Sequence, residues 1–221
     1  MKFLKMVTIG GILMGFSLFS IFASGQQNKE STFWNWFQEN EDMIFHFESD
    51  QEKIFDKLSS ELQKVNPSLT FEFGPIKNGK REFVISAAGI KSAFPSVESL
   101  FSSAPKLEKW EVKKFRPRRS IVNDIEYGDK FVAAKNVSYQ LIRGENKIGI
   151  ILFIDGYNEA EKTTYKQIGY LMLDEALGEY DTEIKVGAIE FQPRTSKYFL
   201  GAHPLNELAA DFDGQFANLQ K

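Results

Sequence analysis

The chain has 221 residues, of which 43% are apolar and 14% aromatic, so it can bury a sizeable core and is not expected to be disordered. Its formal net charge at pH 7 is −3, and basic residues are scattered among acidic ones. Because phosphate backbones require a broad positive face, nucleic acid is excluded as an expected partner. The absence of cysteine excludes disulfide bonds and thiol-linked lipid anchors.

Residues 1–25 have the layout of a secretory signal peptide. Two lysines precede an apolar run over residues 6–23, and small residues occupy positions 23–25. This pattern predicts cleavage between Gly25 and Gln26 and export to the periplasm or the medium. The alternative is an uncleaved membrane anchor, because the run approaches the ~18 residues that span a bilayer. Contact with a membrane is expected only in that case.

Two helices are predicted next. Ser31 or Thr32 can cap a short helix that carries Trp34 and Trp36 within an aromatic run. That helix either packs over a sheet as a lid or presents an aromatic platform to a sugar, lipid or peptide. A second helix is predicted from about Asp50 to Val65, where apolar residues recur at helical spacing after the capping-box pair of Ser49 and Glu52.

The following stretch predicts a unit of strand, turn, strand, helix and strand. Apolar residues alternate before Asn78-Gly79, the strongest short signal for a hairpin turn, and Pro117 ends the last strand. The predicted strands and helix lie, in chain order, at residues 69–73, 83–85, 94–101 and 110–115. A less regular segment over residues 120–136 follows as a linker, with short strands near residues 124–127 and 131–133.

A second unit of the same plan is predicted after the linker. Its strands lie near residues 137–141, 148–154 and 184–191, and its helix begins after Asn158 and ends at Gly178. The continuously apolar strand at 148–154 predicts a central strand covered on both faces. A last helix is predicted to begin at Pro204 and to dock onto the sheet.

The two units therefore read as a repeat. Each last strand ends in the pattern Phe-Xaa-Pro-Arg, at residues 115–118 and 191–194. A helix between the second and third strands favours their parallel pairing, and the hairpin supplies antiparallel pairing. The expected fold is α+β, with a mixed sheet and helices packed on it. The alternative is that the likeness is a coincidence, since the helices differ in length.

The two histidines do not predict a metal site. His46 lies beside Phe45 in an expected half-buried strand position, and His203 precedes the last helix without a second ligand at metal spacing. The sequence has no glycine-rich phosphate loop, nucleophile elbow or HExxH pattern. We therefore predict neither a metal nor a cofactor.

An arginine cluster and an acidic group are the strongest candidates for binding. The arginines follow the ends of strands, where a guanidinium fork can grip a carboxylate or phosphate. The acids surround the C-terminal end of a helix, where negative charge opposes the helix dipole. The two groups either neutralise each other in an internal ion-pair network, or form an anion site, or supply a carboxylate pair for a cation or a proton.

Four phrases of the sequence carry a family resemblance. They are FEFGP, GKREFVISAAGIKSAFPSVESLFSSAPKL, WEVKKFRPRR and LMLDEALGEYDTEIKVGAIEF. Together they resemble a bacterial family of small hypothetical proteins classed as a domain of unknown function, over nearly all of the chain after the leader. The resemblance implies an intact bacterial domain and no particular activity.

The sequence predicts a signal peptide over residues 1–25 and one α+β domain over residues 26–221, with halves at about 50–119 and 137–195. We expect an exported module that binds a small anionic ligand or a protein. The alternative is a hydrolase or isomerase that uses a carboxylate with an arginine, which requires a concave pocket holding both groups. The candidate ligand-binding residues are Arg116, Arg118, Arg119, Arg194, Glu175, Glu179, Asp181, Trp34 and Trp36.

Overall fold

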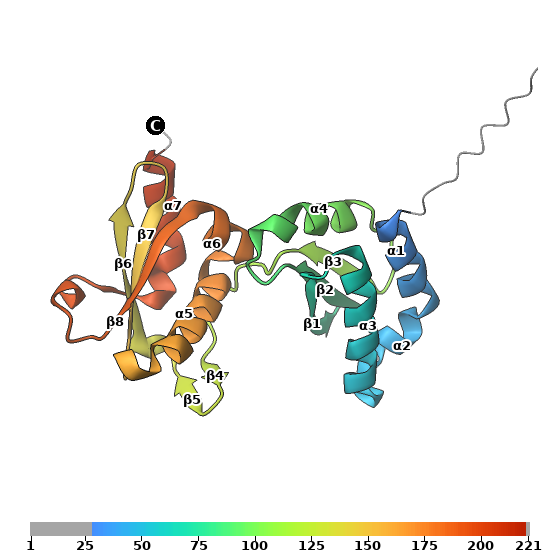
Figure 1. Cartoon of the computed structure of the whole chain (residues 1–221), viewed down its shortest axis with the longest axis horizontal. Coiled ribbons are helices and arrows are strands. Elements are labelled where there is room, and N and C mark those ends of the chain that lie inside the picture. Colours follow the sequence, from blue (N-terminus) through green and yellow to red (C-terminus); the bar gives the residue numbers. More distant parts are fainter. Residues whose placement is uncertain (1–27, 220–221) are drawn as a thin grey trace, which may run out of the picture.

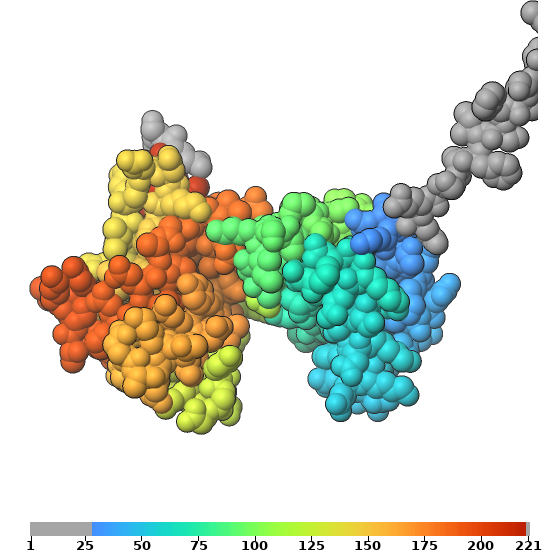
Figure 2. Space-filling model, viewed as in Figure 1, coloured from blue at the N-terminus to red at the C-terminus, as the bar shows by residue number. Residues whose placement is uncertain are grey.

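The computed structural model describes residues 28–219, and the predictions for residues 1–25 lie outside that range. Within it, no helix combines the length and apolar character that a membrane span requires. The chain forms two lobes that lie side by side and meet at a narrower waist (Figures 1 and 2). A segment around residues 115–124 passes from one lobe to the other.

The first lobe contains four helices and one sheet. Its elements are α1 (Lys29–Glu39), α2 (Glu41–Phe45), α3 (Gln51–Val65), β1 (Thr70–Lys77), β2 (Lys80–Ser86), α4 (Phe94–Ser102) and β3 (Trp110–Lys114). The strand order is β1-β2-β3, with β1 antiparallel and β3 parallel to β2. Asn78 and Gly79 form the hairpin turn with φ angles of 51° and 75°, as their sequence predicts.

The core of the first lobe lies between one face of its sheet and helices α1, α3 and α4. Strand β2 contributes Phe83 and Ile85, both fully buried, because alternate residues of a strand share one face. Phe37 of α1 stacks on Phe83 with their ring centroids 5.1 Å apart. Trp34 is buried beside them, and its indole N–H donates to the carbonyl of Leu100 at 2.8 Å. The aromatic helix is therefore a lid over the sheet.

The second lobe follows the same plan with additions at both ends. Its elements are β4 (Ile125–Tyr127), β5 (Lys130–Val132), β6 (Val137–Arg143), β7 (Ile148–Ile154), α5 (Lys162–Leu177), α6 (Glu179–Lys185), β8 (Val186–Gln192), β9 (His203–Pro204) and α7 (Leu208–Leu219). The larger sheet has the order β8-β7-β6-β9, with β7 antiparallel to β6 and parallel to β8. Strands β4 and β5 form a separate hairpin.

Strand β7 is central and covered on both faces, as predicted. Ile150 and Leu152 belong to a core that also includes residues of α5 and α7. Phe153 points to the other face, where its ring lies 5.4 Å from the ring of Phe199. This arrangement explains why the strand is apolar at almost every position.

The α+β prediction is confirmed, and the two units share their strand order and pairing. Both place the middle strand between an antiparallel and a parallel neighbour. The units do not share a sheet, because each builds its own sheet around its own buried cluster.

Two local predictions about helix starts were wrong. The N-cap of α1 is Asn28, whose side chain accepts a hydrogen bond from the backbone N–H of Glu30, and not Ser31 or Thr32. Helix α3 begins after Asp50 without a side-chain capping bond, so the pair of Ser49 and Glu52 forms no capping box.

Two further predictions, the strand around His46 and the start of the last helix at Pro204, were wrong. His46 ends helix α2 and bonds to the carbonyl of Asp42, so it does not lie in a strand. Pro204 pairs with Ser138 of β6 as part of β9, and the last α-helix begins only at Leu208.

Candidate functional site

The segment that crosses the waist carries the first Phe-Xaa-Pro-Arg pattern. Phe115 has a φ of 59°, a backbone conformation that residues other than glycine rarely adopt. This conformation turns the chain away from β3. Gly178 of the second lobe approaches this turn with a φ of 79°. A Cβ at this position would lie only 3.3 Å from the Arg118 backbone nitrogen, which is a tight contact. Glycine at position 178 therefore allows the two backbones to meet.

Glu179 is the main link between the lobes. Its carboxylate is fully buried and accepts hydrogen bonds from the backbone N–H groups of Ala87 at 3.0 Å, Gly89 at 3.1 Å and Arg116 at 3.0 Å. Ala88 and Gly89 have φ angles of 48° and 78°, so the loop after β2 forms a concave group of amides of the kind that binds anions. The anion in that concavity is the side chain of Glu179.

Arg116 adds a second link. Its guanidinium donates to Glu72 of the first lobe and, at 3.0 Å, to Asp174 of the second. Arginine suits this position because its planar fork offers donors to two carboxylates at once.

Arg118 is held by three acceptors of the second lobe. Its Nε donates to the carbonyl of Leu177 at 2.7 Å, which satisfies an acceptor at the end of α5. Its terminal nitrogens donate to Asp181 at 2.6 Å and to Asp213 at 2.7 and 2.9 Å. Four of the five N–H donors of the Arg118 guanidinium therefore have acceptors within the protein.

Arg119 and Glu175 are bound less tightly by side-chain contacts. The nearest carboxylate to the Arg119 guanidinium is Glu72, at 3.8 Å, although the backbone N–H of Arg119 donates to the carbonyl of Glu175 at 2.7 Å. The Glu175 carboxylate accepts from the backbone and side chain of Asn123. These contacts hold the linker against α5.

Asp174 differs from the other acids because burial raises its pKa to about 6. The attraction of Arg116 lowers this pKa, but the loss of solvent and the nearby charge of Glu179 outweigh it. The hollow around Asp174 has a volume of only ≈ 80 Å³. It can hold a few water molecules, whereas drug-sized ligands occupy roughly 300 Å³ or more.

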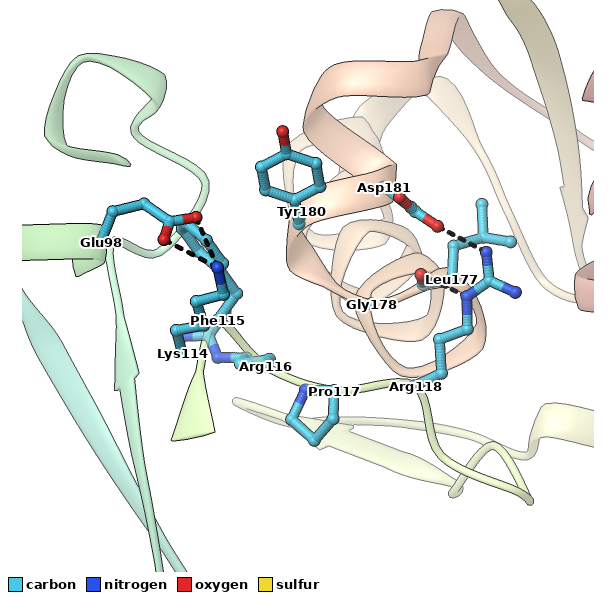
Figure 3. Close-up of a pocket in the computed structure, with 10 residues that line it drawn as sticks. All are labelled: Glu98, Lys114, Phe115, Arg116, Pro117, Arg118, Leu177, Gly178, Tyr180 and Asp181. Atoms are coloured by element: carbon cyan, nitrogen blue, oxygen red, sulfur yellow. Dashed lines mark hydrogen bonds and ion pairs between the residues drawn. The ribbon is translucent and has the colours of Figure 1, made fainter. Parts of the chain in front are cut away.

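A larger hollow of ≈ 390 Å³ adjoins the first one and shares Arg116 and Pro117 with it. Its lining includes Phe115 and Tyr180, whose ring centroids lie 5.2 Å apart and which come from different lobes. Figure 3 shows the pair of Glu98 and Lys114 on one side of it and Arg118 on the other. We call this space the junction hollow, and its remaining lining residues are Arg116, Pro117, Leu177, Gly178 and Asp181.

The charged groups of the junction hollow differ in how firmly they are held. Lys114 donates to both carboxylate oxygens of Glu98 at 2.9 and 2.7 Å, but both side chains are more than 40% exposed. Such exposed pairs stabilise a fold by only about 0–1 kcal/mol. Lys114 is therefore free to exchange its partner, in contrast to Arg118.

Three of the candidate residues lie outside this site. Arg194 stays in its own lobe, where its guanidinium lies 4.9 Å from the ring centroid of Phe199. Trp34 is buried and Trp36 packs against the same core, so they present no open platform. These positions correct the platform interpretation and the expectation that Arg194, as the counterpart of Arg118 in the repeat, belongs to the same binding cluster.

Sequence reasoning missed several residues of the site. Glu72, Glu98, Lys114, Tyr180 and Asp213 come from separate elements, and only the folded chain brings them to the junction. It also missed a cluster of His203, Glu207 and Asp211, whose ligand-type atoms lie within 4.8 Å of one another. Their spacing of four residues was the available signal.

Comparison of the chain with protein-family models, with curated proteins and with solved structures finds no significant match. The resemblance to a family of unknown function stays a prediction.

Proposed function

We propose that this chain is an exported, non-enzymatic module that binds a small amphipathic anion, such as a carboxylate with an apolar body, in the junction hollow. The observation that carries the proposal is a hollow of ≈ 390 Å³ with aromatic lining residues and an exchangeable lysine. This volume falls within the range of roughly 300–1,000 Å³ that small-molecule sites occupy.

The ligand's apolar part would contact both lobes. Tyr180 of α6 packs on Phe94 and Phe115 of the first lobe, with ring centroids 5.9 and 5.2 Å away, and is still 44% exposed. A ligand that covers Tyr180 would bury apolar area, which stabilises the complex by roughly 25 cal/mol per Å².

The ligand's charge would replace Glu98 as the partner of Lys114. Three cationic side chains line the hollow, but Arg116 is bonded to Glu72 and Asp174, and Arg118 to Asp181 and Asp213. Because Arg118 already bonds to Leu177, Asp181 and Asp213, Lys114 is the cation that can bind a ligand without breaking contacts of the junction.

The test is a thermal-shift screen of the purified protein against aromatic and aliphatic carboxylates, preceded by native mass spectrometry for a co-purified ligand. A ligand at one hundred times its Kd should stabilise the protein by about 2.7 kcal/mol. We expect Lys114→Gln and Tyr180→Ala to reduce that stabilisation. Lys113→Gln is the matched control, because Lys113 is a neighbouring exposed lysine that pairs with Glu111 outside the hollow.

A ligand whose effect is the same in Lys114→Gln and in the parent contradicts the proposed site. The absence of any stabilising carboxylate and of any co-purified ligand contradicts the function itself. Export is tested separately by the mass of the mature protein from its native host. A start at or near Gln26 is expected, and intact Met1 in a membrane fraction contradicts cleavage.

The second candidate is a hydrolase or isomerase in which Asp174 transfers a proton beside Arg116. The raised pKa of Asp174, about 6, favours this candidate because a proton donor works best near the ambient pH. This candidate ranks second because the hollow around Asp174 has a volume of only ≈ 80 Å³. A substrate would first have to displace Arg116 or Glu72. Turnover abolished by Asp174→Asn, with ligand binding intact, would favour it.

A further inference from the structure

Among residues that do not line the junction hollow, three side chains offer one ligand atom each to a common point. They are His203, Glu207 and Asp211, and their candidate ligand atoms lie within 4.8 Å of one another. We propose that these residues form a binding site for a divalent transition metal, with Zn²⁺ as the best fit. This site is independent of the proposed function.

The spacing of the three groups suits tetrahedral zinc. His203 Nδ1 lies 3.5 Å from Glu207 Oε2 and 3.8 Å from Asp211 Oδ2. Ligands bound to zinc at about 2.0–2.2 Å in a tetrahedron lie about 3.4 Å from one another. Small rotations of the side chains therefore suffice to bring all three atoms to one ion.

The backbone fixes the three residues on different elements. His203 is held in β9 by its pairing with Tyr139 of β6, Glu207 ends the 3-10 turn Leu205–Glu207, and Asp211 lies in the first turn of α7. Sites on paired strands and helices keep their ligands in place better than sites on loops.

One buried side chain orients a ligand from behind. Tyr139 is 1% exposed, and its hydroxyl donates to Asp211 Oδ2 at 2.5 Å. Such outer partners fix the direction of a metal-binding carboxylate, and their loss commonly costs 10–100-fold in affinity. The oxygen that accepts from Tyr139 is the same Oδ2 that lies 3.8 Å from His203 Nδ1, so one of its two lone pairs remains for an ion.

The donor set decides the class of ion. One imidazole nitrogen with two carboxylates suits zinc and its first-row neighbours, whereas calcium and magnesium prefer oxygen ligands alone. Neutral histidine with two carboxylates carries a charge of −2, which a divalent ion neutralises. Three protein ligands leave a fourth position for water or for an external group.

The experiment is titration of the untagged full chain with Zn²⁺ in a calorimeter, with Mg²⁺ as the comparison ion. We expect one zinc per chain and no comparable heat from Mg²⁺. His203→Ala should weaken zinc binding at least about tenfold, and Tyr139→Phe about tenfold through loss of the orienting hydroxyl. His46→Ala is the matched control, because it removes the other histidine and should leave binding unchanged.

Glu207→Gln tests the site in a residue whose side chain is 53% exposed and whose replacement leaves the core intact. Added Co²⁺ should broaden the imidazole NMR signals of His203 and spare those of His46. The proposal is overturned by an absence of zinc binding, by equal binding of Mg²⁺, or by zinc binding that survives both His203→Ala and Glu207→Gln.

Discussion

The two lobes share a strand plan but use the same short pattern for different purposes. In the first lobe, Phe115 turns the chain out of the sheet and Arg118 donates to acceptors across the waist. In the second lobe, the chain after Pro193 turns back on itself, and Arg194 lies against Phe199 of the same lobe. The partners of an arginine in this pattern therefore depend on the path of the backbone after the motif.

The loops that follow the middle strands differ in the same way. After β2, the amides of Ala87 and Gly89 find their acceptor only in Glu179 of the other lobe. After β7, the amides of Asp155 and Tyr157 bond to carbonyls of their own lobe. The first lobe is thus completed by the second, and the predictions below test that dependence.

The largest effect is expected from Glu179→Ala. It leaves the amides of Ala87, Gly89 and Arg116 without their acceptor at a buried position. The free energy of unfolding should fall by about 3 kcal/mol or more, as measured by urea denaturation. Glu190→Ala on β8 is the control, because Glu190 is exposed and bonds only to Gln192. A loss below about 1 kcal/mol, or one matched by the control, would show that Glu179 does not join the lobes.

The next largest effect is a dependence of the free energy of unfolding on pH, caused by Asp174 at the junction of the lobes. Because folding raises the pKa of Asp174 from 3.8 to about 6, the folded state holds its proton more tightly than the unfolded state. The titration of Asp174 therefore adds to the free energy of unfolding in full below about pH 4. This contribution, at most about 3 kcal/mol, is lost as the pH rises through about 6.

Replacing Asp174 by asparagine should remove that decline. Stability curves of the parent and of Asp174→Asn, measured between pH 4 and 7, should differ in slope in this window. Asp129→Asn is the control, since the Asp129 side chain is 88% exposed. Parallel curves for the parent and Asp174→Asn would contradict the assigned pKa.

Replacing the two equivalent arginines gives a smaller, direct comparison of the lobes. Arg118→Ala should lower the free energy of unfolding by about 1.5–3 kcal/mol, because it removes hydrogen bonds to charged partners and to the end of α5. Arg194→Ala should cost less than about 1 kcal/mol, since it loses one exposed cation–π contact. Equal losses in both variants would mean that the two lobes use the motif alike.

The smallest effect concerns the hairpin turns. Gly79→Ala should cost about 1–2 kcal/mol because the residue has a φ of 75°. Asn146→Ala in the longer turn of the second lobe should change stability by less than about 0.5 kcal/mol, since Asn146 does not have a positive φ. The measurement is the urea midpoint of each variant. A larger loss of stability in Asn146→Ala than in Gly79→Ala would contradict the prediction.

The fold was predictable because its signals are local. Alternating apolar residues and Asn78-Gly79 identify β1 and β2, and the apolar run of β7 indicates its central position. The strand order followed from the chain's need for a helical crossover before each third strand.

The site was less predictable because its bonds join distant parts of the chain. Glu179 was predicted only as one of the acids around the C-terminal end of a helix, and its role could not be foreseen because its partners are backbone amides, which every sequence has. The arginines and acids could be foreseen as an ion-pair network, but not that Arg116 would reach Glu72 or that Arg118 would reach Asp213. His203 was passed over because no second ligand was recognised at metal spacing, although Glu207 and Asp211 follow it at intervals of four residues.

The amide concavity after β2 has one more consequence. The first lobe and the crossing segment contribute only main-chain donors there, at Ala87, Gly89 and Arg116, so Glu179 binds no side chain of theirs by a hydrogen bond. At position 179, by contrast, only a side chain of glutamate's length and charge reaches all three. At the amide concavity, therefore, the side chain that determines the contact belongs to the second lobe alone, and a protein that was to receive the first lobe would need a carboxylate at this place.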